Sequence, residues 1–406
     1  MGGRRIVVTG LGVISAIGRT VPEFWDSLVA GRSGIGPMET VDRSQFRFQN
    51  GAEVRGYAPP DYFEEKEITL LDRFAQFALI ACSEAVRDAG VEWSRETSAR
   101  TAIVTGSCLG GQVSQDQAFY DVYWEKRGRI QPLSIPRVMA NAATSHISMK
   151  YGITGPAFTV STACSSANHA IGQAFWMVRD GTADMAIAGG SDAPFAFAML
   201  KAWEAMRVVA PDTCRPFAKD RKGMILGEGA GILILEPLEA AQARGARIYA
   251  EIAGFGMTAD AHHITQPSVD GPAAAMRAAL ADAALDLTQV GYINAHGTGT
   301  PVNDPAEVTA IRKAFGDHAE RLAVSSTKSM HGHALGAAGA LEAVATVLAL
   351  HHGIAPPTAN FTEPDPECDL YVVPNQARRL DVEAALSNSF AFGGLNAVLA
   401  FRRWGE

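Results

Sequence analysis

Strands and helices are predicted to alternate along the chain in two successive runs that begin alike. The first run starts with an apolar segment that contains Gly10-Leu-Gly12, and the second starts with one that contains Gly254-Phe-Gly256. Such alternation is typical of α/β proteins, in which helices cover a sheet. Because no linker or low-complexity segment separates the runs, we expect a layered α/β protein with two related halves, residues 3–246 and 247–404.

Hydrophobic periodicity places further elements within each half. In the first half it predicts helices over 24–30 and 71–89, strands over 101–106 and 184–190, and an exposed loop or subunit contact over 120–136. In the second half it predicts strands over 290–295 and 322–326, helices over 271–284, 304–315 and 336–351, and a final pair of strands.

The segment from Ala157 to Arg179 is predicted to be a strand that turns directly into a helix. From Ala157 to Thr162, the residue types alternate as they do in a short buried strand. From Ser165 onward, the apolar residues follow the spacing of a helix. Cys164 lies at the junction, where the N–H groups and the dipole of the helix start favour a thiolate and lower its pKa. A sharp strand-to-helix turn also presents a nucleophile well. The alternative is a small buried apolar residue, which many free cysteines are.

Composition excludes several classes of protein. A net charge of −8, without a basic aromatic cluster, argues against nucleic acid as a partner. The five scattered cysteines lack zinc or thioredoxin spacing, which indicates reduced thiols in a cytoplasmic protein. We see no signal peptide and no apolar run able to span a bilayer, so a soluble protein is expected.

Three stretches of the second half combine polar side chains with glycine, each at a predicted strand end. They cover residues 294–304, 325–342 and 388–396. Ligand sites of open α/β sheets gather at such ends. The histidines at 296, 331 and 333 are possible zinc ligands, but no carboxylate or thiol completes a set and Lys328 would repel a cation, so we expect no metal.

These stretches resemble the four signatures of the β-ketoacyl-acyl-carrier-protein synthases, in order and over essentially the whole chain. The four are Thr162-Ala-Cys-Ser-Ser, Asn294-Ala-His-Gly-Thr-Gly-Thr-Pro, Ser326-Thr-Lys-Ser-Met-His-Gly-His-Ala-Leu-Gly-Ala-Ala-Gly and Asn388-Ser-Phe-Ala-Phe-Gly-Gly. The resemblance is closest to type II elongating enzymes, with polyketide and nodulation-type features at Ser165, Ser166 and Gly299. It implies a thiolase fold, in which two pseudo-symmetric halves form a five-layer α/β/α/β/α stack, usually as a homodimer.

The resemblance also implies an activity and its catalytic residues. Cys164 would accept an acyl chain from an acyl carrier protein, and malonyl carrier protein would lose CO₂ and lengthen that chain by two carbons. His296 and His333 would donate hydrogen bonds to the developing enolate, as neutral imidazoles can. The backbone N–H groups of Cys164 and Phe392 would form an oxyanion hole, with Phe392 also serving as a gate. No cofactor is required, because the carrier protein brings its own phosphopantetheine.

A second set of residues is assigned by the same resemblance. Lys328 either tunes the electrostatics around His333 or is a structural partner of Asp304 and Glu307. Glu342 is expected to organise Lys328 and water. Thr265, Thr298 and Thr300 match the family's pantetheine contacts. Leu109 and Phe390 match positions of its acyl pocket. Arg127, Arg129 and Arg207 match its basic carrier-docking face. For the threonines, local backbone bonding is the alternative.

Other functions remain as alternatives. A degradative thiolase needs a second cysteine in a Cys-x-Gly context, which Cys368 does not supply. A non-catalytic chain-length subunit typically lacks the nucleophile, whereas Cys164 is present. A dedicated ketosynthase, or a partner subunit, of a specialised polyketide or signalling-lipid pathway is the alternative closest to the main prediction.

Overall fold

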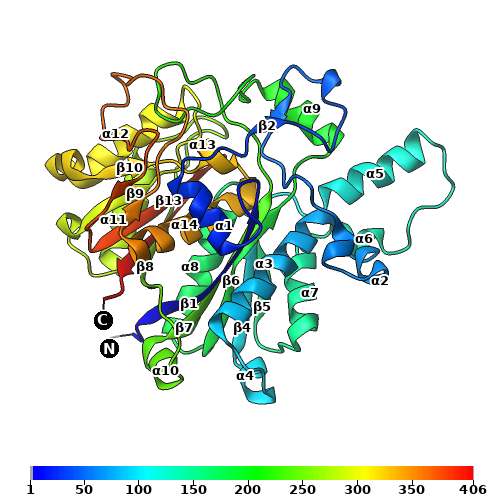
Figure 1. Cartoon of the computed structure of the whole chain (residues 1–406), viewed down its shortest axis with the longest axis horizontal. Coiled ribbons are helices and arrows are strands. Elements are labelled where there is room, and N and C mark those ends of the chain that lie inside the picture. Colours follow the sequence, from blue (N-terminus) through cyan, green and yellow to red (C-terminus); the bar gives the residue numbers. More distant parts are fainter. Residues whose placement is uncertain (1–2, 406) are drawn as a thin grey trace.

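The computed structural model describes residues 3–405, and its core is one ten-stranded mixed sheet that a short seam divides into two five-stranded parts (Figure 1). Hydrogen bonds run through the strands in the order β10-β9-β13-β14-β8-β1-β7-β6-β4-β5. At the centre of this order, β1 and β8 share only three residue pairs, from Ile6 opposite Ile252 to Val8 opposite Ala250. The short seam divides the strands into one sheet for each half of the chain.

The strands of the first sheet are β1 (Ile6–Ser15), β4 (Thr101–Gly106), β5 (Ala157–Val160), β6 (Met185–Asp192) and β7 (Gly229–Pro237). Those of the second are β8 (Ala250–Ala259), β9 (Val290–Asn294), β10 (Ala323–Ser325), β13 (Ala384–Ala391) and β14 (Leu395–Arg403). The principal helices are α1 (Val21–Val29), α3 (Arg73–Ala89), α5 (Gln112–Tyr123), α6 (Ser134–Val138), α7 (Ala142–Tyr151), α8 (Ser166–Arg179), α9 (Phe197–Met206), α11 (Asp270–Asp282), α12 (Asn303–Phe315) and α14 (Ala338–His352). Shorter elements are β2 (Gly36–Pro37), β3 (Asn50–Gly51), β11 (Ile354–Ala355), β12 (Arg378–Arg379), α2 (Glu65–Ile68), α4 (Arg95–Ala99), α10 (Leu238–Ala243) and α13 (Lys328–His331).

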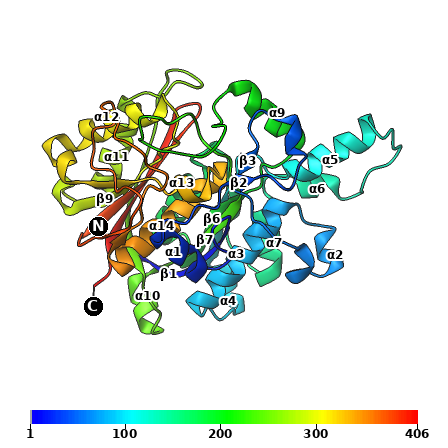
Figure 2. The same ribbon diagram turned by 45° about the horizontal axis from the view of Figure 1, so that its top comes forward.

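Helices α8 and α14 form a central layer between the two sheets. Helix α8 packs on β4 and β6 of the first sheet and contacts β8 and β14 of the second, while α14 packs on β7 and β13. Helices α3 and α7 cover the outer face of the first sheet, and α11 and α12 that of the second (Figure 2). This is the predicted five-layer α/β/α/β/α stack of the thiolase fold, with two similar halves.

The central layer explains the most apolar helix of the chain. Residues Leu335–His352 are long and apolar enough to cross a membrane, but 89% of this stretch is buried inside the protein. A helix that packs against sheets on both sides has no solvated face and is therefore apolar all round. The stretch is a core helix.

The repeated glycine pairs allow a helix to lie directly on the first strand of each half. A Cβ atom at Gly12 would lie 1.9 Å from the Ala81 carbonyl oxygen of α3, and one at Gly256 would lie 2.2 Å from the Ala275 oxygen of α11. Any side chain would push the helix away from the sheet. Gly10-Leu-Gly12 and Gly254-Phe-Gly256 are thus alike because each allows a helix to pack closely on the first strand of its half.

Two local predictions were wrong in part. The strand predicted to be buried is β5, whose residues Ala157 and Phe158 are exposed, because β5 is an edge strand that pairs only with β4 in the part of the chain described. The exposed loop or subunit contact predicted over 120–136 has no buried residue, as expected, but it begins inside α5, a helix that stands away from the body of the protein (Figure 1). Because α5 has no buried residue, its sequence lacks the apolar stripe by which helices are predicted.

Candidate active site

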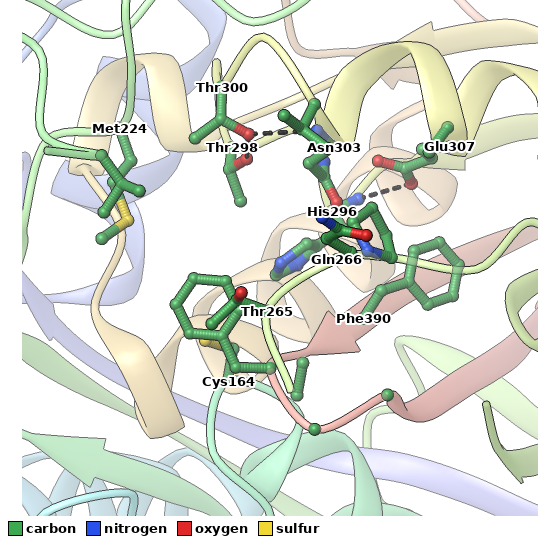
Figure 3. A pocket seen from close by; sticks show the side chains of 18 of the residues that line it. Cys164, Met224, Thr265, Gln266, His296, Thr298, Thr300, Asn303, Glu307 and Phe390 are labelled. Atoms are coloured by element: carbon green, nitrogen blue, oxygen red, sulfur yellow. Dashed lines mark hydrogen bonds between the residues drawn. The ribbon is translucent and has the colours of Figure 1, made fainter. Parts of the chain in front are cut away.

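A cavity of about 480 Å³ is lined by all three predicted catalytic side chains, Cys164, His296 and His333. Figure 3 shows Cys164 and His296 at this cavity. Cys164 comes from the start of α8 in the first half, whereas His296 and His333 come from loops of the second half. Phe390 and Phe392 complete the same wall. The cavity therefore lies where strand ends of the two sheets meet the central helical layer.

The turn before α8 holds Cys164 in a strained position. Ala163 has φ +52°, a conformation that costs a residue with a Cβ atom free energy and that is typical of functional turns. Two serines fasten this turn: the Ser165 hydroxyl donates to the Thr162 carbonyl at 2.8 Å, and the Ser166 hydroxyl donates to the Ala163 carbonyl at 2.6 Å. Ser165 and Ser166 thus stabilise the predicted nucleophile elbow through local hydrogen bonds.

The electrostatic balance at Cys164 differs from the prediction. Burial raises the pKa of the thiol to about 11, against the opposing effects of the Lys328 charge and the Phe392 N–H. The helix start favours the thiolate, but the low-polarity surroundings of a side chain that is 7% exposed favour the neutral thiol more strongly. A pKa of about 11 favours the protonated thiol at neutral pH, so a nucleophilic role of Cys164 would require the proton to leave as the sulfur attacks.

This pKa predicts how Cys164 reacts with a small alkylating agent. Because the thiolate fraction rises tenfold per pH unit below the pKa, carbamidomethylation by iodoacetamide should accelerate about a hundredfold from pH 7 to pH 9. Peptide mapping should locate the label at Cys164, since this thiol lines the cavity and burial raises the pKa of Cys82, Cys214 and Cys368 further, to about 12. A Cys164→Ala variant is the control, and a rate that is flat between pH 7 and 9 would contradict the raised pKa.

The hydrogen bonds of His296 and His333 define which nitrogen of each ring carries the proton. The Leu335 N–H donates to His333 Nδ1 at 3.1 Å, and Lys328 Nζ lies 3.4 Å from His296 Nδ1, to which it can only donate. Each ring therefore carries its proton on Nε2, which has no hydrogen-bond partner within residues 3–405. The two rings lie 5.4 Å apart and perpendicular, so the cavity wall offers two N–H donors side by side.

Burial and charge keep both imidazoles neutral. Burial lowers the pKa of His296 and of His333 well below the usual range, and the nearby Lys328 charge lowers both further. A neutral imidazole donates a hydrogen bond without giving up its proton. This pair can therefore stabilise a developing negative charge without becoming an acid.

Lys328 pairs with Glu342, and the alternative that it is a partner of Asp304 and Glu307 was wrong. Lys328 is fully buried; its ammonium group forms an ion pair with Glu342 and donates to the His296 carbonyl oxygen at 2.7 Å. The expected link between Glu342 and Lys328 is present. Since a buried charge needs compensation, the pair fixes a cation beneath the histidine pair.

Asp304 and Glu307 instead hold the backbone of the His296 loop. Glu307 accepts the N–H groups of His296 and Gly297 at 2.8 and 2.7 Å, and Asp304 accepts that of Gly299 at 3.1 Å. Gly299 has φ +76°, which favours glycine. The two carboxylates thus shape the loop rather than neutralise Lys328.

Phe392 occupies the position expected of a gate. Its ring lines the cavity, is 36% exposed and stacks on Trp203 with centroids 6.4 Å apart. Its backbone N–H and that of Cys164 face the Cys164 sulfur. Gly393 and Gly394 follow with φ +84° and +70°, so the loop turns back sharply directly after Phe392.

The remaining predicted contacts divide into those that line the cavity and those that do not. Lining residues include Thr265, Thr298, Thr300, Phe390 and Arg207. Thr298 and Thr300 also bond each other at 3.0 Å, so part of their bonding is local. Residues outside the lining are Leu109, which packs in an apolar cluster with Met224 and Leu335, and Arg127 and Arg129, on the loop after α5.

Sequence analysis did not single out Asp192, at the end of β6. This fully buried carboxylate accepts four hydrogen bonds, three from the loop that follows β4 and one from the turn that follows His333. A Gly-Gly-Ser-Asp sequence at a strand end was the one available signal. It does not reveal which distant N–H groups meet the carboxylate.

His331 lies outside the cavity lining. Its Nδ1 bonds the Gly332 carbonyl oxygen at 2.8 Å, and its Nε2 accepts from Thr327. No group of three His, Cys, Asp or Glu residues with metal-binding geometry occurs in residues 3–405. The imidazole of His331 is accordingly a structural group.

Comparison with known proteins gives a consistent result. Residues 3–241 match the N-terminal domain of beta-ketoacyl synthases and residues 249–362 match the C-terminal domain. Nodulation protein E of Rhizobium sp. (strain N33) is 49% identical over 400 residues, which cover 98% of this chain and 99% of that protein. The 3-oxoacyl-[acyl-carrier-protein] synthase 2 of Staphylococcus aureus (strain COL) is 41% identical over 408 residues, which cover 99% of each.

Solved structures agree along the full chain. The ishigamide ketosynthase/chain length factor superposes with a TM-score of 0.95 at 38% identity, over 99% of this chain and 100% of that one. A type II polyketide ketosynthase, solved in complex with its acyl-carrier protein, superposes with a TM-score of 0.91 at 32% identity and the same coverage. The chain therefore belongs to the beta-ketoacyl synthase family and has its thiolase-like fold.

Proposed function

We propose that this beta-ketoacyl synthase is an elongating 3-oxoacyl-acyl-carrier-protein synthase of type II, acting in the cytoplasm. The observation that carries the proposal is the set of groups around one cavity: the Cys164 thiol, two Nε2–H donors and two backbone N–H groups. Condensation needs these groups and no bound cofactor, because the carrier's phosphopantetheine brings both substrates.

In the first step, the acyl chain moves from the carrier thioester to Cys164. The sulfur attacks the thioester carbonyl, and the N–H groups of Cys164 and Phe392 stabilise the oxyanion. The C–S bond to pantetheine breaks, and the thiol proton of Cys164 ends on the departing pantetheine sulfur. Acyl transfer thus needs no net proton from solvent.

In the second step, malonyl carrier protein loses CO₂. The electron pair of the breaking C–C bond forms an enolate, whose oxygen accepts the Nε2–H groups of His296 and His333. The enolate carbon then attacks the acyl-Cys164 carbonyl, and the thioester bond breaks to release the cysteine sulfur. That sulfur regains one proton. This proton uptake balances the negative charge that is lost when the malonyl carboxylate leaves as CO₂.

The mouth of the cavity suits the arm of a carrier protein. Thr265, Thr298 and Thr300 line it and can bond the amides of pantetheine, while Arg207 provides a positive charge. Carrier proteins of this family are acidic, so a basic mouth aids their encounter. Arg127 and Arg129 would contribute to docking from the loop after α5.

The direct test is an assay of purified protein with malonyl carrier protein and acyl carrier proteins of increasing chain length. We expect mass spectrometry to detect a 3-oxoacyl product two carbons longer than the acyl substrate, together with one CO₂ per turnover. Protein alkylated at Cys164 is the matched control and should give no product. Decarboxylation without any elongation by the unmodified protein would contradict the proposal.

A dedicated pathway is the second candidate. Nodulation protein E of Rhizobium sp. (strain N33) is 49% identical to this chain, compared with 41% for the 3-oxoacyl synthase 2 of Staphylococcus aureus (strain COL). The same assay distinguishes the two candidates if it includes both a housekeeping and a specialised carrier protein. Product with the specialised carrier alone would favour the dedicated pathway.

The exposed face around α5 suits a second copy of the chain, and we propose a homodimer. Tyr123 and Trp124 are 71% and 74% exposed at the end of α5, and Ile135 of α6 is 68% exposed. Phe158 lies on the open edge of β5 on the same half. Exposed apolar groups in such number mark a protein interface.

Light scattering after gel filtration should give twice the mass of one chain. A Tyr123→Glu/Trp124→Glu variant should shift the protein to the monomer mass, because two charges would be buried in the interface. Ile264→Glu is the control: this residue is 70% exposed but lies on the cavity loop, and the variant should remain a dimer. Wild-type protein at the monomer mass would overturn the homodimer.

A further inference from the structure

Asp192 lies where three segments around the cavity meet. Its carboxylate is fully buried at the end of β6, between the loop that follows β4 and the turn that follows His333. The mechanism proposed above uses neither Asp192 nor the loop after β4. A buried carboxylate is costly unless several donors stabilise it, and Asp192 has four of them.

The two oxygens of Asp192 have different partners. Oδ2 accepts the Gly336 N–H at 2.7 Å and the Cys108 N–H at 2.9 Å. Oδ1 accepts the Ser107 hydroxyl at 2.7 Å and the Leu109 N–H at 3.3 Å. One side chain thus joins the His333 turn to the loop that carries Leu109.

The first of these connections bears on catalytic geometry. His333 Nδ1 accepts the Leu335 N–H, and Leu335 has φ +50°, an unfavourable conformation for a residue with a side chain. The next residue, Gly336, donates to Asp192 Oδ2. The bond to Asp192 therefore helps to maintain the strained turn that keeps the His333 proton on Nε2.

The second connection bears on the acyl pocket. Leu109 packs in the apolar cluster that contains Met224 and Leu335, and Met224 itself lines the cavity. Leu109 thus lies behind the cavity wall, where an acyl chain longer than the open cavity would have to extend. The Leu109 N–H donates a hydrogen bond to Asp192, and the Gly110 N–H donates one to the Ser107 hydroxyl.

Close packing shows that these segments have little freedom to move independently. A Cβ atom at Gly336 would lie 2.4 Å from the Cys108 nitrogen, and one at Gly190 would lie 2.9 Å from Ala167 Cβ. A Cβ atom at Gly106 would lie 2.4 Å from the Ser166 carbonyl carbon, at the start of the helix that follows Cys164. Backbones this close transmit a displacement directly.

We propose that Asp192 is a positioning residue for condensation, holding the His333 turn and the Leu109 loop in one arrangement through its two carboxylate oxygens. This inference rests on the proposed function. In this proposal, the hydrogen bonds to Oδ2 maintain the geometry of His333 for decarboxylation. The hydrogen bonds to Oδ1 maintain the position of the Leu109 loop, which limits the length of the acyl chain.

An Asp192→Asn variant separates the two roles. The amide group must replace one oxygen, and at Oδ2 it would meet two N–H donors, whereas at Oδ1 it can donate to the Ser107 hydroxyl. The variant should therefore keep the Gly336 and Cys108 bonds and lose the Leu109 bond. We expect kcat for malonyl decarboxylation within about threefold of wild type. The kcat/KM preference for the favoured acyl chain over one two carbons longer should fall by about tenfold.

An Asp192→Ala variant removes the hydrogen bonds of both carboxylate oxygens. Its kcat for decarboxylation should fall roughly a hundredfold through misplacement of His333, with KM for malonyl carrier protein nearly unchanged. Glu84→Gln is the matched control: Glu84 accepts the Val13 and Val21 N–H groups at 2.9 and 2.7 Å on the outer helix α3. It should lower the melting temperature without moving either kinetic readout.

The outcomes decide between a positioning and a purely structural role. If Asp192→Asn lowers only the melting temperature, as Glu84→Gln does, and leaves the chain-length profile unchanged, the proposal is overturned. This comparison does not require the alanine variant to fold. A wild-type protein without condensing activity would overturn the proposed function and this inference together, whereas an active wild type with unchanged variants would overturn this inference alone.

Discussion

A Cys164→Gln variant is expected to lose condensation by roughly 10³- to 10⁴-fold while it continues to decarboxylate malonyl carrier protein. Glutamine has no nucleophile, so no acyl-enzyme can form. Its amide oxygen can accept the backbone N–H groups of residues 164 and 392, the proposed donors to the thioester oxyanion, so the variant should resemble the acylated enzyme. The enolate site, formed by the His296 and His333 Nε2–H groups, is untouched.

The measurement follows both reactions on one preparation: CO₂ release from malonyl carrier protein, and product length by mass spectrometry. Cys82→Ala is the control, because Cys82 is buried on α3, outside the cavity lining, and its loss should leave both rates near wild type. Loss of decarboxylation together with condensation in the folded Cys164→Gln variant would show that the two sites are not separable as proposed.

A His333→Ala variant is expected to lower the decarboxylation rate by about 10²- to 10³-fold, the usual effect of removing one oxyanion donor. The neighbouring imidazole cannot compensate, because the Lys328 charge and the His296 carbonyl contact fix its position. Acyl transfer to Cys164 should suffer less, since the proposed donors to its oxyanion are backbone N–H groups.

His331→Ala is a demanding control for this variant. His331 is equally buried two residues away, yet it bonds Gly332 and Thr327 instead of lining the cavity. It should destabilise the fold but change the decarboxylation rate of the folded enzyme by no more than about threefold. Equal losses in the two variants would mean that the rate reports the integrity of this loop, and not a hydrogen bond from His333.

Elements with a strong hydrophobic period were predictable from the sequence. Helix α3 was predicted over 71–89 and spans Arg73–Ala89, because one face lies on the sheet and the other is solvated. Helix α5 was missed because it has no buried residue. The strand predicted over 157–162 is present as β5, and only its burial was mispredicted, because its first two residues are exposed.

The candidate site was predictable where function requires particular residue types in local sequence. Cys164, His296 and His333 were singled out for this reason, and the structure places them around one cavity. The partner of Lys328 was left open, because a buried cation can pair with any carboxylate that the fold brings near. Asp192 was missed because its donors at 107–109 and 336 are distant in sequence. The raised pKa of Cys164 depends on burial, which sequence alone does not measure.

The shared central layer has a consequence for recombination between related enzymes. Helix α8 belongs to the first half and α14 to the second, yet each packs on strands of both sheets as well as on the other. A chimera joined between residues 246 and 247 would bring together two helices that had never been selected to fit one another. Functional chimeras should therefore exchange α8 and α14 as a pair. The outer helices α3 and α11 can be exchanged together with the strands of their own half.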